Sequence, residues 1–134
     1  ATPADVERVE SSYEALNRRD IEGTVAVLHD DAKWVEHSDL PEAGTYEGVG
    51  TIQSFLEHFM ESWEDFHQEI EERIVRGPCL LLFIHLEARG QGSGIEVDSS
   101  YAHLWQVREG KGARVDAYYD RDQALAALRA AYGE

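Results

Sequence analysis

Apolar residues recur every three or four positions near the start of the chain, a pattern that predicts an amphipathic helix. Thr2, Pro3 and Asp5 form a helix start, with a hydroxyl cap, a proline where its missing N–H is harmless, and an acid in the first turn. The apolar stripe that follows consists of Val6, Val9, Tyr13 and Leu16.

Two further helices and one strand are predicted before the middle of the chain. Asp20 is placed to cap a short second helix, and the alternating segment from Ala32 to His37 is too short for a helix and predicts a strand. After a polar loop that contains Pro41 and Gly44, large apolar residues spaced by three and four predict a third helix. Its apolar face consists of Ile52, Phe55, Leu56, Phe59 and Trp63.

The second half of the chain predicts β-strands. Residues 66–75 alternate between apolar and polar, as a strand with one wet face does. Residues 79–88 are apolar on both faces, which predicts a central strand with helices on one side. Because no remaining element of the chain is expected to cover the other side, we predict a homodimer through the outer face of the sheet.

The last strand has two possible registers against the strand over residues 95–107. A three-residue loop from Arg108 to Gly110 would pair odd residues with odd residues and place Tyr119 on the face of His103. A two-residue loop of Glu109 and Gly110 would present Asp116 and Tyr118 instead. Asp120 caps a short C-terminal helix in either case.

Composition predicts one acidic domain over residues 1–134. The chain has 134 residues, 43% of them hydrophobic, which suffices for one core and is too few for two domains. Its formal net charge of -15 repels phosphate backbones and anionic lipid, so we expect neither nucleic acid nor membrane as a partner. No signal peptide and no bilayer-spanning apolar run are recognised, and we expect a cytoplasmic protein. Cys79 is expected to be a small buried hydrophobe.

Phosphate loops, hydrolase triads and zinc protease motifs are absent from the sequence, and we predict no cofactor. His103 and His85 are the histidines that could share a metal ion. If the connecting hairpin turns near Gln91, His103 lies opposite about Leu81, roughly 13 Å from His85 at ~3.3 Å per residue, too far for one ion. We therefore predict no metal.

The order of elements and three tracts of sequence resemble a known family. The tracts are ALNRRDIEGTVAVLHDDAKWVEH, TYEGVGTIQSFLEHF and YAHLWQVREGKGARVDAYYDRDQALAAL. They resemble the SnoaL-like proteins of the nuclear transport factor 2 superfamily, which includes ketosteroid isomerase. The resemblance implies an α+β fold: a cone-shaped α+β barrel in which three N-terminal helices pack in a strongly curved, mostly antiparallel sheet, with a short C-terminal helix and one apolar pocket.

The resemblance implies roles for Glu36 and His103. DDAKWVE is similar to the isomerase stretch that carries the general base, and Glu36 falls at that position; a salt-bridged or solvent-facing Glu36 is the alternative. YAHLW is similar to the strand whose protonated aspartate holds the substrate oxyanion, and His103 occupies that place, although such a histidine is also a common hydrogen-bonded core residue. The tyrosine of the first isomerase helix is replaced by Ser12, and Tyr13, one position away, is expected on a different face, so steroid isomerisation itself is not expected.

Two functions follow as hypotheses. The first is an enzyme that acts on a small, largely apolar carbonyl or cyclic compound by proton transfer, as an isomerase, cyclase or hydrolase-like enzyme, with Glu36 as base and His103 as acid or oxyanion donor. The second is a binding or dimerisation module without catalysis. The residues predicted to contact the ligand are Trp34, Phe59, Trp63, His85, Tyr101, Trp105 and Tyr119.

Overall fold

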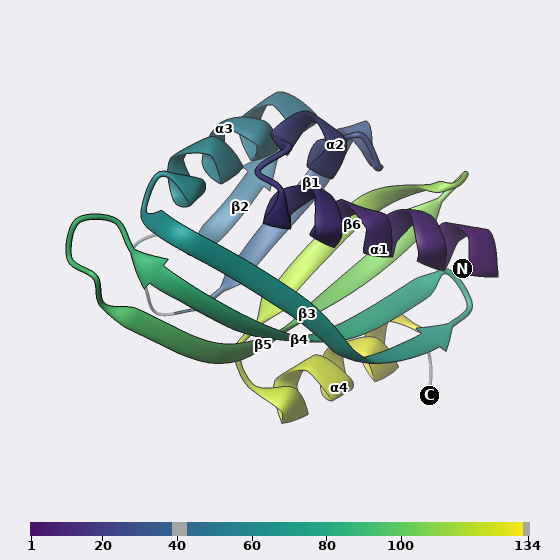
Figure 1. The fold of residues 1–134 in the computed structure, drawn as a ribbon. Coiled ribbons are helices and arrows are strands. Elements are labelled where there is room, and N and C mark those ends of the chain that lie inside the picture. Colours follow the sequence, from purple (N-terminus) through teal and green to yellow (C-terminus); the bar gives the residue numbers. More distant parts are fainter. Residues whose placement is uncertain (39–42, 133–134) are drawn as a thin grey trace.

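Four helices and six strands make up the computed structural model of the chain, which describes residues 1–38 and 43–132 (Figure 1). In chain order they are α1 (Pro3–Asn17), α2 (Ile21–Val25), β1 (Leu28–His37), β2 (Gly44–Glu47), α3 (Val49–Met60), β3 (Trp63–Arg76), β4 (Cys79–Gly90), β5 (Glu96–Arg108), β6 (Lys111–Tyr118) and α4 (Arg121–Ala131). The predicted α+β fold is confirmed. The predicted polar loop is only partly described, since Pro41 lies outside the described residues.

The strands form one curled sheet in the order β2-β1-β6-β5-β4-β3. β1 and β6 are parallel, and the other neighbours are antiparallel. Among the described strands, β2 and β3 are the two edges, so the sheet curls without closing into a barrel. Helices α1, α2 and α3 lie on one side of the sheet and α4 on the other (Figure 1).

The predicted helix start at Thr2 is confirmed. The Thr2 hydroxyl accepts a hydrogen bond from the Asp5 N–H, and the Asp5 carboxylate accepts one from the Thr2 N–H, which together form a capping box. The other end of α1 is tied to the sheet by Asn17, whose side chain bonds both the N–H and the C=O of Gln68 on β3. These contacts fix the inward face of α1 against β3.

The sequence pattern predicted Trp63 on the third helix, and this prediction is wrong. The helix ends at Met60, and Trp63 is the first residue of β3. Arg19 holds this change of direction, because its guanidinium donates hydrogen bonds to the C=O groups of Met60 and Trp63 at 3.2 and 2.7 Å. A spacing of four residues after Phe59 therefore misled the prediction, because the helix had already ended.

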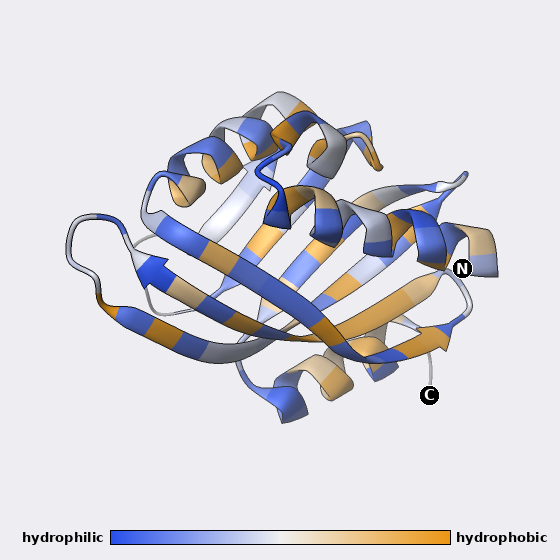
Figure 2. Cartoon of the chain, in the orientation of Figure 1, coloured by the Kyte–Doolittle hydropathy of each residue, from blue (hydrophilic) through white to orange (hydrophobic). Residues whose placement is uncertain are grey.

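The outer face of β4 is covered by α4, which removes the argument for a homodimer. Leu81 and Phe83 pack with Ala124 and Leu128 in a second hydrophobic cluster, and Leu81 has no exposed surface. Figure 2 shows the continuous hydrophobic run at the start of β4 that this helix shields. The C-terminal helix thus does what the sequence analysis assigned to a second subunit, and the homodimer stays a prediction without this support.

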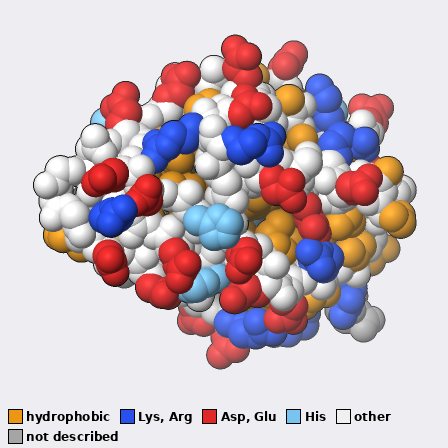
Figure 3. All heavy atoms as spheres, viewed as in Figure 1, with side chains coloured by type: hydrophobic (Ala, Val, Ile, Leu, Met, Phe, Trp, Pro, Cys, Tyr) orange, Lys and Arg blue, Asp and Glu red, His pale blue; other side chains and the backbone are white. Residues whose placement is uncertain are grey.

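The burial of Cys79 and the acidic surface agree with the sequence analysis. Cys79 is buried at the start of β4, and burial raises the pKa of its thiol, as suits a packing residue. Acidic side chains are spread over the face shown in Figure 3, with basic ones between them. Within the described part of the chain no helix has the length and hydrophobicity to cross a membrane.

Candidate functional site

A cavity of about 210 Å³ lies between the helices α1, α2 and α3 and the concave face of the sheet. Most of its wall is apolar or aromatic, and polar groups from α1, β1, β3 and β5 reach it. Of the residues predicted to form the site, those that line the cavity are Trp34, Glu36, Phe59, Tyr101, His103, Trp105 and Tyr119.

Glu36 and His103 reach the cavity from opposite sides of the same strand. Glu36 on β1 and His103 on β5 both pair with Ala117 on the intervening β6. Residues opposite one another in a sheet share a face, and two strand spacings separate the outer pair by roughly 10 Å between Cα atoms. The small side chain of Ala117 between them leaves room above the sheet.

The carboxylate of Glu36 is buried and held by two neutral donors. It is 8% exposed. Trp34 Nε1 donates to Oε2 at 2.6 Å, and Tyr119 Oη donates to Oε1 at 2.5 Å. Within the described residues no lysine, arginine or histidine pairs with Glu36, so the predicted alternative of a salt-bridged or solvent-facing glutamate does not hold.

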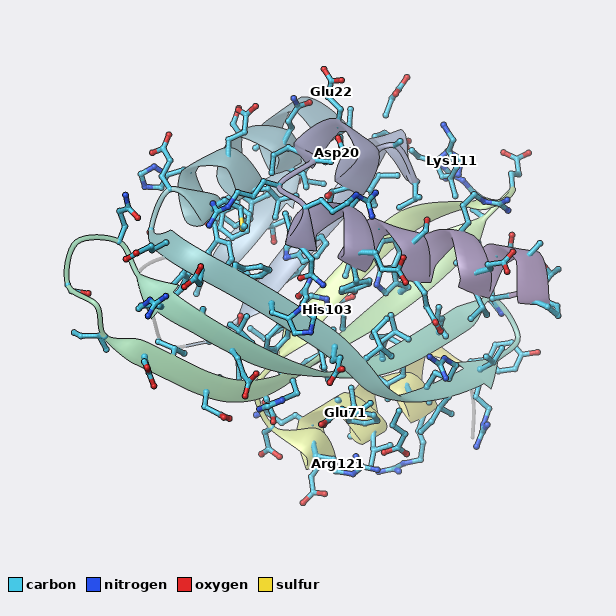
Figure 4. All side chains as sticks on the ribbon, in the orientation of Figure 1. Asp20, Glu22, Glu71, His103, Lys111 and Arg121 are labelled. Carbon is cyan, nitrogen blue, oxygen red and sulfur yellow. The ribbon has the colours of Figure 1, made fainter. Side chains whose placement is uncertain are left out.

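His103 is an uncharged group at the opposite wall. It is 7% exposed, and burial lowers its pKa from 6.5 to about 3. Figure 4 shows it in the space between α1 and the sheet. The Trp34 ring lies edge-on to the His103 ring, with 4.9 Å between centroids, and its Nε1 donates to the Glu36 carboxylate, so Trp34 contacts both groups. Since His103 is uncharged and makes no hydrogen bond to Glu36 among the described residues, the two do not form an ion pair.

Tyr13 faces the cavity, contrary to the sequence-based expectation. Its hydroxyl lies 2.6 Å from Nδ1 of His103 and accepts a hydrogen bond of 2.8 Å from Trp105 Nε1. Ser12 also lines the cavity. Because the cavity wraps around α1, neighbouring positions that are about 100° apart on the helix both reach it.

Gln68 is a cavity residue that the sequence analysis did not select. It is buried on β3, and its Oε1 accepts a hydrogen bond of 2.5 Å from Tyr101 Oη. Burial, followed by the charge of Glu36, raises the pKa of Tyr101, so this hydroxyl keeps its proton. The sequence contained a signal for this position, since Gln68 lies between Phe66 and Ile70 on the apolar face of the predicted strand.

His85 and Trp63 lie outside the cavity. β4 and β5 pair His103 with Leu82, one residue from the predicted Leu81, and this difference of one places His85 on the outer face. There His85 Nε2 contacts Asp98 Oδ1 at 2.7 Å. Trp63 packs edge-on against Phe59, and its Nε1 is the one buried side-chain nitrogen or oxygen among the described residues without a hydrogen-bond partner.

One group of side chains on the outer face could hold a metal ion. The ligand atoms of His85, Glu87 and Asp98 lie within 4.8 Å of one another. Hydrogen bonding to Asp98, followed by the nearby carboxylates, raises the pKa of His85, so a metal would compete with a proton for this ring. Glu87 and Asp98 are exposed, and the group is separated from the cavity by the sheet.

The loop before β6 is the two-residue alternative, but the face that β6 presents to the cavity is the one expected for the three-residue loop. Arg108 pairs with Lys111 across a two-residue turn, in which Glu109 and Gly110 have positive φ angles of 51° and 82°. A bulge beyond Gln106 then shifts the pairing by one, so that His103 faces Ala117. Tyr119 consequently lies on the cavity side, as predicted.

Asp116 and Tyr118 lie on the outer face of β6. The carboxylate of Asp116 contacts His37 Nε2 at 2.9 Å and accepts hydrogen bonds from Arg114. Tyr118 stacks on the His37 ring. These contacts show that the outer face of β1 and β6 is a polar network separate from the cavity.

Comparison with known proteins gives a family and a fold. The model of a SnoaL-like domain matches residues 9–115. The comparison with curated protein sequences found no match.

Solved structures of similar proteins cover nearly the whole chain. TerC, co-crystallised with polyporic acid, is 26% identical, covers 93% of this chain and 97% of its own, and has a TM-score of 0.78. A protein from Jannaschia sp. CCS1, proposed to be a SnoaL-like polyketide cyclase, is 17% identical, with coverages of 100% and 97% and a TM-score of 0.77. A protein from Catenulispora acidiphila with a ketosteroid isomerase-like fold, in complex with trimethylamine, is 17% identical, with coverages of 94% and 92% and a TM-score of 0.73.

Proposed function

The chain belongs to the SnoaL-like domain family, and on that premise we propose that its cavity binds a small, largely apolar organic molecule with a carbonyl group, on which Glu36 carries out proton transfer. The observation that carries the proposal is the Glu36 carboxylate, which is 8% exposed, faces an aromatic cavity, and is held by Trp34 and Tyr119 without a cationic partner in the described region. A buried carboxylate without a counter-charge is costly for stability, which favours a functional reason for it.

The size and polarity of the cavity support this class of ligand. Its volume of about 210 Å³ suits a molecule of one or two rings. The similar proteins TerC and the Catenulispora protein were crystallised with small organic compounds, polyporic acid and trimethylamine. The described cavity wall contains no lysine or arginine, so the ligand is expected to have little negative charge.

In the proposed reaction, the Glu36 carboxylate removes a proton from a carbon next to the ligand carbonyl. The electron pair of the C–H bond forms a double bond to the carbonyl carbon, and the π pair of the C=O bond moves onto the oxygen, which gives an enolate with its negative charge on that oxygen. His103, opposite Glu36 across Ala117, donates a hydrogen bond to that oxygen. In an isomerase, Glu36 returns the proton to another carbon. In a cyclase, the enolate carbon attacks a second carbonyl to form a C–C bond, and the oxygen of that carbonyl takes the proton back from Glu36.

Exchange of carbon-bound hydrogen for solvent deuterium tests proton transfer without knowledge of the natural substrate. With the bicyclic ketone β-tetralone in deuterated buffer, proton NMR should show faster loss of the signal next to the carbonyl when the protein is present. Glu36→Gln should lower this rate on the order of a hundredfold, since it removes the base while keeping the shape. Glu47→Gln on the exposed strand β2 is the matched control and should exchange like the parent protein.

A binding module without catalysis is the second candidate, and one observation favours it. Both oxygens of Glu36 already accept hydrogen bonds from the protein, so the carboxylate has its partners without a substrate. If β-tetralone quenches the fluorescence of the cavity tryptophans but exchanges no faster than in buffer, the module reading is correct. Native mass spectrometry of protein purified from its own cells would then identify the retained molecule.

A further inference from the structure

Trp105, Tyr13 and His103 form a hydrogen-bonded chain at the wall of the cavity. Trp105 and His103 are two residues apart on β5, and Tyr13 reaches them from α1. Trp105 Nε1 lies 2.8 Å from Tyr13 Oη, and Tyr13 Oη lies 2.6 Å from His103 Nδ1. Trp105 and Tyr13 are buried, so water does not compete for these bonds.

The chemistry of the three groups gives the chain one direction. An indole N–H can only donate, so Tyr13 Oη accepts from Trp105. The Tyr13 hydroxyl carries a single proton, and the pKa of Tyr13 is raised well above its ordinary value by burial, so that proton is retained. Its one acceptor among the described residues is His103 Nδ1. The opposite arrangement would leave a buried hydroxyl proton without an acceptor, which is unfavourable.

The other ring nitrogen of His103 faces the cavity. Within the described residues His103 Nε2 makes no hydrogen bond. A fully buried nitrogen without a partner would resemble Trp63 Nε1, which is the one such side-chain atom there, and His103 Nε2 is not in that state. His103 Nε2 is therefore not sealed by protein atoms. Because His103 lines the cavity, this nitrogen is open to whatever the cavity holds.

We propose that Trp105 and Tyr13 are positioning residues that hold His103 in the tautomer with its proton on Nε2, so that His103 presents a permanent, uncharged N–H donor to a carbonyl oxygen of the ligand. The assignment of a ligand to this donor rests on the proposed function, whereas the tautomer is a property of the protein alone. His103 thereby works as a fixed donor and is not the acid of the reaction.

The surroundings keep this donor uncharged over the ordinary pH range. The titratable groups that face His103 are Tyr13 from α1 and Tyr101 from its own strand, and the pKa of each is raised, so both stay neutral. Among the described residues Glu36 on β1 makes no hydrogen bond to His103, and Trp34 contacts both. An uncharged donor selects a ligand with an acceptor oxygen at this end and gives no preference to a carboxylate over a ketone.

The tautomer can be measured in ligand-free protein by NMR of the imidazole nitrogens after histidine labelling. His103 should show an unprotonated Nδ1 and a protonated Nε2, with no titration between about pH 5 and 9. Tyr13→Phe removes the hydroxyl and keeps the ring, so the two tautomers should become mixed. Trp105→Phe should shift the equilibrium in the same direction, provided that its circular dichroism spectrum shows a folded protein.

Tyr101→Phe is the matched control, because it removes a cavity hydroxyl that bonds Gln68 instead of His103. It should leave the His103 tautomer unchanged. A proton on Nδ1 in the parent protein, a charged His103 at neutral pH, or an unchanged tautomer in Tyr13→Phe would overturn the proposal. β-Tetralone should shift the His103 Nε2–H signal; a correct tautomer with no such shift would instead count against the ligand class of the proposed function.

Discussion

Tyr119 Oη donates a hydrogen bond of 2.5 Å to Oε1 of Glu36, although 83 residues separate the two in sequence. The parallel pairing of β1 with β6 places Glu36 opposite Ala117, and Tyr119 lies two residues beyond Ala117 on the same face. Tyr119 is 49% exposed, whereas the carboxylate that it bonds is buried. We expect this hydrogen bond to orient the Glu36 carboxylate.

Tyr119→Phe should therefore lower the rate of deuterium exchange into β-tetralone by about tenfold. The variant loses one hydrogen bond to the carboxylate, which contributes about 1.4 kcal/mol, and this energy corresponds to a tenfold change in rate. Tyr132→Phe, at a similarly exposed tyrosine on the C-terminal side of α4, is the control. Equal rates for the two variants would show that the Trp34 hydrogen bond alone orients Glu36.

Burial of His103 makes the stability of the protein depend on pH. The pKa of His103 is lowered from 6.5 to about 3, so the unfolded chain binds a proton as the pH falls through about 6.5 while the folded protein does not. The contribution of His103 is complete above about pH 6.5 and is lost as the pH falls towards 3, by about 1.4 kcal/mol per pH unit.

His103→Gln isolates this effect from the many acidic groups, because those titrate alike in both proteins. Urea unfolding at several pH values should show the parent protein losing stability faster than the variant as the pH falls below about 6.5. Parallel curves for the two proteins would mean that His103 is solvated or already charged in the folded state.

The sequence predicted the elements more reliably than their contacts. Helical and strand periodicity located α1, α3 and the long strands, because burial of one face imposes that periodicity locally. The sequence also predicted the C-terminal helix, but not that it covers the outer face of β4. Docking of this kind depends on the curvature of the whole sheet, which no local pattern records.

The candidate site illustrates the same limit at single residues. Glu36, His103 and Tyr119 were predicted to face the cavity and do line it, Tyr119 because the bulge beyond Gln106 restored the register that a two-residue turn would have changed. Such a bulge leaves little trace in sequence. Tyr13 was misplaced because counting positions along a helix ignores the length of a tyrosine side chain and the width of the cavity around α1.

The packing of α4 predicts a large difference between two leucines of the same helix. Leu128 is 5% exposed and contacts the outer cluster, whereas Leu125 is only partly buried at its edge. Leu128→Ala should lower the free energy of unfolding by about 2 to 3 kcal/mol, and Leu125→Ala by less than about 1 kcal/mol. Sedimentation of both variants beside the parent protein would show whether loosening α4 changes the assembly state, which is also the direct test of the predicted homodimer.

Gly112 on β6 supports the site by leaving room for the Trp105 ring. A Cβ at position 112 would lie 2.6 Å from Trp105 Cζ3 and 3.2 Å from Leu28 Cδ2, and the ring is itself buried. Gly112→Ala should therefore destabilise the protein by about 1 to 3 kcal/mol, as overpacking does. Because Trp105 would have to shift and its Nε1 bonds Tyr13, the variant should also mix the His103 tautomers in the NMR experiment, a change that a loss of stability alone would not cause.

Gly50→Ala is the matched control for this prediction. Gly50 lies in the first turn of α3, and nothing stands within 4 Å of the Cβ that would be added. Alanine reduces the conformational freedom of the unfolded chain and suits a helix, so this variant should be more stable by about 0.5 kcal/mol and keep the His103 tautomer. A Gly112→Ala protein as stable as Gly50→Ala would show that Trp105 can shift without cost, and the chain from Trp105 through Tyr13 to His103 would then lack the rigid start that the geometry gives it.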